Sequence, residues 1–386
     1  AALLRRFKPG EPETQSYFTG DSAPSFSVPR CERFPVLISL KRYAAWINKQ
    51  DAENSRSVIS YILSLINRKA NASLSIRDFR RLLSGYSWAF LFDGLDEVPA
   101  SSNRNEVLHQ IQEFLERDLV ESSCDSLVVC TSRPQGYDDA FSPYWYNHYE
   151  LKDMSAPLCK SYIEKLLTFL EDNGDERDRY RKILHNALND PMVSKLMTTP
   201  LYTAIIVLLV KMGGTPPTKR YALFQEYCEI VIKREKQKEM LPSLYDEYDW
   251  IMKLHAQIGF QLQAESETAE NAAAELSAVR CKQLIVQFLQ DEGFEGESLA
   301  KSEDFYFAMT TRLSFLSEVS GSDQEACVLF PLRSIQEYFA AEWLISFDNE
   351  DKLSEALEHI SVSAYWRNVY LFVAGYFTKH RSRKNM

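Results

Sequence analysis

Glycine followed by lysine does not occur anywhere in this sequence. P-loop nucleotide hydrolases carry the pattern GxxxxGK[ST], in which backbone amides and a lysine hold the phosphates of the nucleotide. None of the 13 glycines in this chain of 386 residues is followed by lysine. The chain by itself therefore lacks the most recognisable part of a P-loop site.

Paired cysteines are also missing. The chain has seven cysteines, an odd number, and no two of them form a CxxC motif. Scattered cysteines of this kind argue against a disulfide framework and against a zinc site. We therefore predict a reducing compartment and a cytoplasmic protein. The positions are Cys31, Cys124, Cys130, Cys159, Cys228, Cys281 and Cys327.

Long apolar runs are absent as well. The longest is LYTAIIVLLV (201–210), whereas a membrane-spanning helix needs about 20 apolar residues. We expect a buried core helix there and no membrane partner. The opening residues, AALLRRF (1–7), lack the apolar core and cleavage site of a signal peptide. They resemble the end of an amphipathic helix, so we expect the chain to begin inside an element.

The sequence has no excess of basic residues. Its 54 acidic and 44 basic residues give a net charge of -10. A nucleic-acid partner is therefore not expected, because nucleic-acid-binding surfaces are normally basic. The hydrophobic fraction of 45% and the charged fraction of 25% are ordinary for a globular protein. The length predicts about two to four domains.

Short apolar runs alternate with amphipathic segments in the first part of the chain. Such strands, separated by helices, are typical of a parallel sheet covered by helices on both faces. The fold class predicted for this part is therefore α/β. The predicted strands are 34–40, 88–93, 126–132 and 146–151, and the predicted helices are 55–69 and 104–119.

Helical patterns dominate after residue 152. The segments 312–319 and 325–332 flank a short turn, and this predicts a hairpin leading into a helix at 334–344. Helices followed by a hairpin are typical of a winged helix. The predicted domains are an α/β domain at 1–152, a helical domain at 153–240, a winged helix at 241–345 and the start of a second helical domain at 346–386.

Acidic side chains follow the buried strand in WAFLFDGLDEVP (88–99). Ligands of parallel sheets bind at the carboxyl ends of the strands, and Asp93 lies at such an end. Its carboxylate suits Mg²⁺, which prefers oxygen ligands. Asp96 or Glu97 can then orient or deprotonate an attacking water molecule. The alternative is an exposed acidic turn at a helix N-terminus, where carboxylates are favoured without any ligand.

Polar residues also end the next predicted strand, in CTSRPQGY (130–137). Thr131, Ser132 and Arg133 are expected at the same sheet edge as Asp93. From there Arg133 can contact a terminal phosphate and report its loss. The alternative is a surface arginine or a structural salt bridge. Two adjacent strand ends of this kind favour a nucleotide site over coincidence.

These motifs together resemble the NACHT family of STAND nucleotide-binding switches. FLFDGLDEV is similar to the family's extended Walker B motif, and TSRP is similar to its sensor segment. TTPLYTAIIVLL (198–209) resembles the start of the helix whose proline packs on the adenine, and FPLRSIQEYFAA (330–341) resembles the winged-helix signature. The resemblance covers nearly the whole chain in the family's order. It implies a P-loop NTPase three-layer sheet, followed by the helical and winged-helix domains.

The same resemblance implies a set of ligands and site residues. The cofactors are ATP or ADP with Mg²⁺. Asp93 is the metal ligand, Asp96, Glu97 and Arg133 are the catalytic residues, and Pro200 and Arg133 contact the nucleotide. The implied protein is a signalling ATPase that opens on nucleotide exchange, associates with itself, and activates an effector in response to a trigger. Innate-immune and antiphage sensors are the parent proteins that it implies.

Two features depart from the family pattern. The winged-helix signature usually has a histidine that contacts the bound diphosphate, and Leu332 occupies its position; Arg333 is a candidate substitute. The second departure is the absence of the phosphate loop. In the family it directly precedes a helix like AALLRRF, so we expect the loop upstream of residue 1 and predict that this chain alone is inactive.

Three other interpretations remain open. The chain can be a non-catalytic scaffold with a decayed nucleotide site. It can be a metal-dependent nuclease that uses Asp93, Asp96 and Glu97, although the net charge argues against this. It can be a winged-helix DNA binder, but the expected recognition segment, RCKQLIVQFLQDE (280–292), is not convincingly basic.

Overall fold

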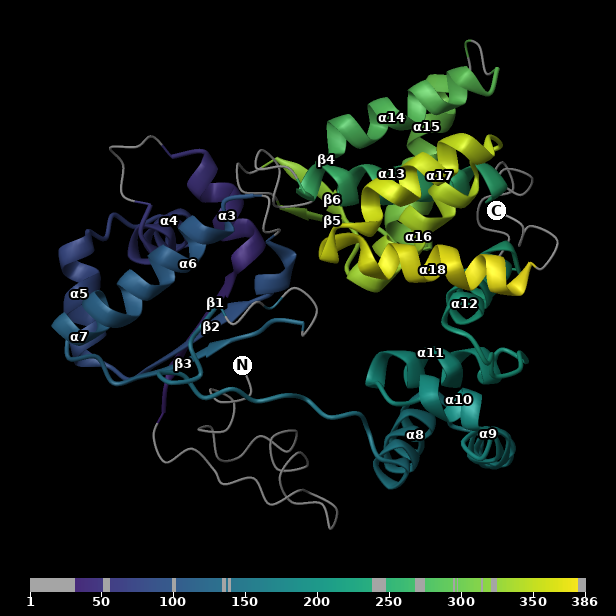
Figure 1. Cartoon of the computed structure of the whole chain (residues 1–386), viewed down its shortest axis with the longest axis horizontal. Helices are drawn as coiled ribbons and strands as arrows, with labels where there is room; N and C mark the ends of the chain where they lie inside the picture. Colours follow the sequence, from purple (N-terminus) through teal and green to yellow (C-terminus); the bar gives the residue numbers. More distant parts are fainter. Residues whose placement is uncertain are drawn as a thin grey trace. The chain divides into compact units, whose positions relative to one another are not determined.

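The computed structural model of the chain divides into two compact units, each described here by itself (Figure 1). Unit 1 comprises Ala1–Ala140 and Glu265–Ala274, and unit 2 comprises Phe141–Ala264 and Glu275–Met386. The predicted division into four domains remains a prediction. The structure describes residues 32–50, 56–98, 102–133, 137, 140–237, 248–267, 275–293, 296, 298–313, 315–320 and 325–380.

Three parallel strands form the sheet of unit 1, in the order β1-β2-β3. Each one corresponds to a predicted strand. Phe92 on β2 is opposite Ile38 on β1 and Cys130 on β3, so the three strands end at one edge of the sheet. The bounds are Phe34–Ser39 for β1, Trp88–Asp93 for β2 and Ser126–Cys130 for β3.

Helices accompany these strands in unit 1 (Figure 1). The two predicted helices are confirmed as α4 and as α6 with its continuation through η2 and α7, while α3 and α5 were not predicted. Ser75 and Asp78 form a capping box that starts α5. The bounds are Leu40–Asn48 for α3, Val58–Ala70 for α4, Ile76–Gly85 for α5, Arg104–Glu113 for α6, Phe114–Asp118 for the π-helical turn η2 and Leu119–Glu121 for α7.

The two faces of this sheet differ in burial. Ile38, Phe90 and Phe92 point to one face and are fully buried; the ring of Phe90 lies 4.9 Å from that of Phe114 on η2. The opposite face includes Leu37, Leu127 and Val129, which are 66%, 49% and 41% exposed. Among the described residues, the predicted covering of both faces is therefore seen on one face only.

The predicted fourth strand at 146–151 is wrong. The segment has no regular secondary structure, and Tyr149 and Leu151 are almost fully exposed. Its aromatic residues suggested a strand, but a strand also needs a neighbour that pairs with its backbone amides and carbonyls. No described strand pairs with this segment.

Five helices open unit 2. The predicted core helix at 201–210 is confirmed in α11, where Ile206, Val207 and Leu209 are fully buried. Thr199 caps this helix by accepting a hydrogen bond from the Tyr202 N–H at 3.3 Å. The bounds are Ala156–Leu170 for α8, Gly174–Ala187 for α9, Pro191–Leu196 for α10, Pro200–Lys211 for α11 and Arg220–Gln237 for α12.

The predicted hairpin and the helix after it are confirmed. Strand β6 pairs antiparallel with β5 and with the short β4, and α16 follows. The bounds are Tyr248–Glu267 for α13, Leu276–Ser277 for β4, Ala278–Asp291 for α14, Ser298–Phe307 for α15, Ala308–Arg312 for η5, Ser317–Ser320 for β5, Ala326–Leu329 for β6, Arg333–Ile345 for α16, Glu350–Ser361 for α17, Ala364–Trp366 for η6 and Arg367–Lys379 for α18.

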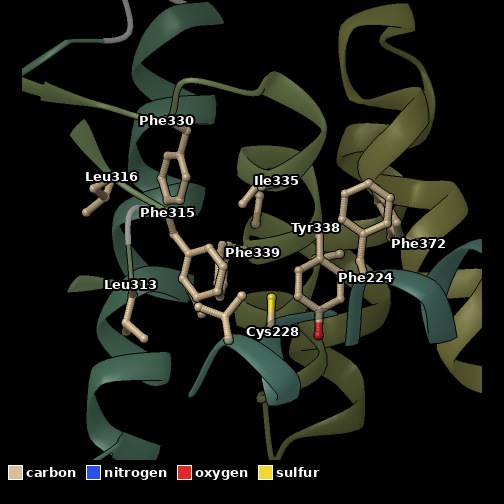
Figure 2. Close-up of a cluster of buried hydrophobic side chains, with 14 of the residues drawn as sticks. Phe224, Cys228, Leu313, Phe315, Leu316, Phe330, Ile335, Tyr338, Phe339 and Phe372 are labelled. Atoms are coloured by element: carbon tan, nitrogen blue, oxygen red, sulfur yellow. The ribbon is translucent and has the colours of Figure 1, made fainter. Parts of the chain in front are cut away.

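One hydrophobic core joins the helices of unit 2 (Figure 2). The rings of Phe224 on α12, Tyr338 on α16 and Phe372 on α18 form a triangle, with centroid distances of 5.1 to 5.8 Å. Gly259 lets α13 approach α16 closely, because an added Cβ would lie 2.9 Å from the Cβ of Phe339. Among the described helices, none is long and apolar enough to cross a membrane.

Candidate functional site

A tight turn follows Asp93 at the end of β2. Gly94 adopts φ 81°, and the next three residues form the 3-10 turn η1 (Leu95–Glu97). Leu95 is fully buried, which anchors the turn in the core of unit 1. The positive φ favours glycine here, and a Cβ on Gly94 would lie 3.2 Å from the Cδ of the Glu97 side chain, which would have to shift slightly. The turn thus places Asp96 and Glu97 within four residues of Asp93, directly after the end of β2.

The end of β3 is hydrogen-bonded to this turn through the backbone. The Thr131 N–H donates to the Phe92 carbonyl, and the Leu95 N–H donates to the Thr131 carbonyl, both at 2.9 Å. These two bonds carry the pairing of the strands one residue beyond Cys130. The prediction that the two strand ends meet at one sheet edge is therefore confirmed.

Thr131 also contacts the turn through its side chain. Its hydroxyl donates to Oδ1 of Asp93 at 2.6 Å and accepts a hydrogen bond from the Gly94 N–H at 2.9 Å. The side chain of Asp93 is exposed. This contact was not predicted. The signal that could have indicated it is a threonine directly after a buried strand, next to a strand that ends in aspartate.

Arg133 and Asp96 form a second contact between the strand ends. The Arg133 N–H donates to Oδ1 of Asp96 at 3.1 Å, and the guanidinium Nε lies 3.5 Å from Oδ2. The Asp96 side chain is only 9% exposed, whereas that of Arg133 is 36% exposed. Arg133 thus stands at the surface with its charge balanced by a nearly buried carboxylate. The chemical roles of both residues stay predictions.

The remaining predicted contacts lie in unit 2. Pro200 is the first residue of α11, directly after its capping residue, and is exposed. Leu332 precedes α16 and is 41% exposed.

Arg333, the candidate substitute for the missing histidine, faces a buried carboxylate. Its Nε lies 3.3 Å from Oε1 of Glu337, a fully buried residue one turn further along α16. Its guanidinium lies over the ring of Tyr365, 4.7 Å from the centroid. The Arg333 side chain is only 13% exposed. Arg333 is therefore a structural partner of Glu337, and this contact argues against a role for Arg333 in binding diphosphate.

The Glu337 carboxylate has further partners from distant parts of the sequence. The Asn368 side-chain amide donates to its Oε1 at 3.1 Å, and an Arg220 guanidinium nitrogen lies 3.8 Å from its Oε2. Arg220 also donates to the side-chain Oδ1 of Asn368 at 3.1 Å. This cluster joins α12, α16 and α18. It was not predicted from the sequence, because Arg220 and Asn368 are 148 residues apart.

Cys130, the last residue of β3, has a thiol whose pKa is raised. Burial raises the pKa of Cys130 to about 12, and the charge of Asp93 contributes to the rise. A thiol with such a pKa stays protonated near neutral pH, whereas the thiolate is the reactive form. The other polar groups at the strand ends are the carboxylates, the Thr131 hydroxyl and the Arg133 guanidinium.

The residues present fit only part of a Mg-nucleotide site. Within the described residues, no three His, Cys, Asp or Glu side chains gather in a way that could hold a metal ion. A nucleotide-bound Mg²⁺ needs less, because it is usually held by one or two carboxylates together with phosphates. The exposed Asp93 carboxylate fits that role. The phosphates themselves find no GxxxxGK[ST] loop in this chain.

No protein-family model matches the chain, and no curated protein matches it. The case for a function therefore depends on the sequence motifs and on the geometry of the two strand ends.

Proposed function

We propose that the protein is a nucleotide-dependent signalling switch of the NACHT kind that binds ATP or ADP with Mg²⁺. The observation that carries this proposal is the meeting of β2 and β3 at one sheet edge. There Thr131 contacts Asp93 at 2.6 Å, and Arg133 pairs with Asp96. This edge is where parallel α/β sheets bind their ligands. The motifs of the sequence supply the nucleotide class.

The proposed roles follow from exposure and contacts. Asp93, exposed at the strand end, holds Mg²⁺ together with the nucleotide phosphates. Glu97 orients the water that attacks the terminal phosphate. Asp96 is nearly buried and paired with Arg133, so it holds the arginine, and Glu97 is the better of the two candidates for activating water. Pro200 remains the proposed adenine contact.

Arg133 offers a means of distinguishing ATP from ADP. Its guanidinium is partly exposed and separated from Asp96 by 3.5 Å, beyond normal hydrogen-bond length. A terminal phosphate brings more negative charge than one carboxylate, so it can compete for the guanidinium when ATP is bound. A switch requires this kind of difference, because a ligand shifts an equilibrium only by its unequal affinity for the two states.

The wider function belongs to the same proposal. The ATP-bound form associates with itself and activates an effector in the cytoplasm after a trigger, as in innate-immune or antiphage defence. Because residues 1–386 contain no glycine followed by lysine, the proposal requires a phosphate loop from residues outside this sequence. The trigger and the effector are also sought outside it.

The alternative function is a non-catalytic scaffold with a NACHT-like architecture. The observation that favours it is the double departure from the family pattern: no phosphate loop within the chain, and Leu332 in place of the diphosphate-contacting histidine. A scaffold keeps the fold without needing either feature. The two functions differ in whether the protein that contains this sequence binds nucleotide.

Titration of the full protein that contains this sequence with Mg-ATP and Mg-ADP tests the proposal. We expect saturable binding of both, and larger assemblies with ATP when mass is measured by light scattering. Asp93→Asn is expected to weaken Mg-ATP binding. Asp172→Asn removes the same charge from an exposed loop residue of unit 2 and is expected to bind normally. Absence of binding in the unaltered protein contradicts the switch and favours the scaffold.

A further inference from the structure

The hydroxyl of Thr131 lies between a backbone amide and a carboxylate. Its Oγ1 is 2.9 Å from the Gly94 nitrogen and 2.6 Å from Oδ1 of Asp93. An N–H group can only donate and an ionised carboxylate can only accept, whereas a hydroxyl does both. The direction is therefore set: Gly94 donates to Thr131, and Thr131 donates its single proton to Asp93. Bonds to a charged acceptor are shorter and stronger than neutral ones.

The backbone of Thr131 is held as firmly as its side chain. Its N–H and C=O are hydrogen-bonded to Phe92 and Leu95, the residues on either side of the Asp93–Gly94 pair. A threonine side chain is also branched at Cβ, which restricts χ1. The hydroxyl thus reaches Asp93 from a backbone that is fixed to the same turn.

We propose that Thr131 is a positioning residue for Asp93. Its hydroxyl fixes the rotamer of the carboxylate and occupies Oδ1, so that Oδ2 is the oxygen presented to a divalent cation. This inference rests on the proposed nucleotide-binding function and adds a residue to it. Free rotation of an exposed carboxylate would otherwise have to be lost each time the cation binds.

Ser132, the residue after Thr131, provides a matched control for the positioning role of Thr131. Thr131 contacts Asp93 and Arg133 contacts Asp96, whereas the hydroxyl of Ser132 between them donates to the carbonyl of its neighbour Arg133 at 3.1 Å. Removing the Ser132 hydroxyl therefore removes a hydrogen bond at the same sheet edge without touching Asp93. Ser132→Ala is the control for Thr131.

The test measures the Mg²⁺ concentration that gives half-maximal ATP turnover in the full protein, at saturating ATP. Thr131→Val keeps the shape of the side chain and removes the hydroxyl. We expect it to raise that concentration by about tenfold, the size of one hydrogen bond to a charged group. Thr131→Ser retains the hydroxyl and is expected to stay within about twofold of the parent, as is Ser132→Ala.

A double-mutant cycle separates positioning from a general loss of structure. If Thr131 acts through Asp93, Thr131→Val changes Mg-ATP affinity in the parent but adds nothing in the Asp93→Asn background. Equal effects in both backgrounds, or failure of Thr131→Ser to restore the Mg²⁺ dependence, overturn the inference. So does a parent-like Mg²⁺ dependence in Thr131→Val.

Failure of the proposed function has a different signature. A parent protein that neither binds nor hydrolyses Mg-ATP overturns the proposed function and this inference with it. Binding and turnover in the parent, with no shift in Thr131→Val, overturn the positioning role alone. Thermal unfolding without nucleotide identifies a Thr131→Val protein that is misfolded, and in that case the Thr131→Ser protein still decides whether the hydroxyl is sufficient.

Discussion

The guanidinium of Arg133 lies beside the carboxylate of Asp96, with Nε 3.5 Å from Oδ2. The Arg133 N–H donates to the other oxygen of the same carboxylate at 3.1 Å. The backbone and the side chain of Arg133 therefore both contact the carboxylate of Asp96. Both residues follow the ends of adjacent parallel strands, so the pair is part of the sheet edge.

Arg133→Ala is expected to reduce the preference of the full protein for ATP over ADP. The guanidinium is the group proposed to meet the terminal phosphate, which ADP lacks. An arginine that acts as a finger contributes roughly 10³–10⁵ in rate, and we expect a smaller effect from a sensor. Competition titration of both nucleotides measures the preference, with the exposed Arg179→Ala as control. An unchanged ratio of the two affinities contradicts the role.

Glu97→Gln is expected to spare ATP binding and to slow hydrolysis, whereas Asp93→Asn is expected to abolish turnover. The difference follows from position. Asp93 ends β2 and is exposed, while Glu97 is at the far end of η1. Single-turnover measurements separate binding from chemistry. Normal ATPase activity in both variants would show that this turn is not part of the ATPase site.

Glu337→Gln is expected to lower the free energy of unfolding by about 1–3 kcal/mol, because it removes the buried negative charge that the partly buried guanidinium groups of Arg333 and Arg220 face. Glu337 is fully buried, with Arg333 Nε at 3.3 Å and an Arg220 nitrogen at 3.8 Å. Urea unfolding of the full protein that contains this sequence, followed by tryptophan fluorescence, gives the value. Glu358→Gln, on the exposed side of α17, is the matched control. Equal unfolding curves for the two variants refute this account of the cluster.

His255 is expected to make unit 2 less stable as the pH falls. Burial lowers its pKa from 6.5 to about 4, against hydrogen bonds to backbone carbonyls that act in the opposite direction. Between these two pH values His255 is protonated in the unfolded chain but not in the folded chain. The free energy of unfolding therefore falls as the pH is lowered from 6.5 to about 4. The loss amounts to about 3 kcal/mol at the acid end.

The comparison of the parent with His255→Phe isolates this effect. The ring of His255 stacks on Phe339 and meets the edge of Phe315, so phenylalanine preserves the packing and removes the titration. Unfolding free energies measured from pH 7 to pH 4 are expected to fall less steeply in the variant. His359→Phe, at an exposed site on α17, keeps the parent slope. Parallel pH curves for the parent and His255→Phe contradict the prediction.

Much of the fold was predictable because burial leaves a clear pattern in the sequence. The strands β1, β2 and β3 are apolar runs of strand length, and α11 is apolar on all sides. The helix α3 was missed because it begins at Leu40, directly after β1, and Leu40 was assigned to the predicted strand 34–40. The helix α5 was missed because only two of its residues, Phe79 and Leu83, are buried. The prediction of a strand at 146–151 was wrong because a strand forms only where a neighbouring strand pairs with it.

The candidate site was predictable in location but not in its contacts. Strand ends marked by Asp93 and Arg133 follow from the position of polar residues after apolar runs. The pairs Thr131–Asp93 and Arg133–Asp96 depend on the register of β2 against β3, which the sequence does not reveal. Arg333 and Glu337 are one helical turn apart and could have been paired, but their partners Arg220 and Asn368 come from other helices.

The central claim is that this sheet edge belongs to a nucleotide site whose phosphate loop lies outside residues 1–386. The most direct test is calorimetric titration of Mg-ATP into residues 1–386 and into a longer protein with an upstream segment carrying GxxxxGK[ST]. We predict no binding by the shorter chain, which we also expect to aggregate, since Leu37, Leu127 and Val129 are exposed on one face of the sheet. We predict micromolar binding by the longer protein. Micromolar binding by a monodisperse shorter chain, or none by the longer one, contradicts the account.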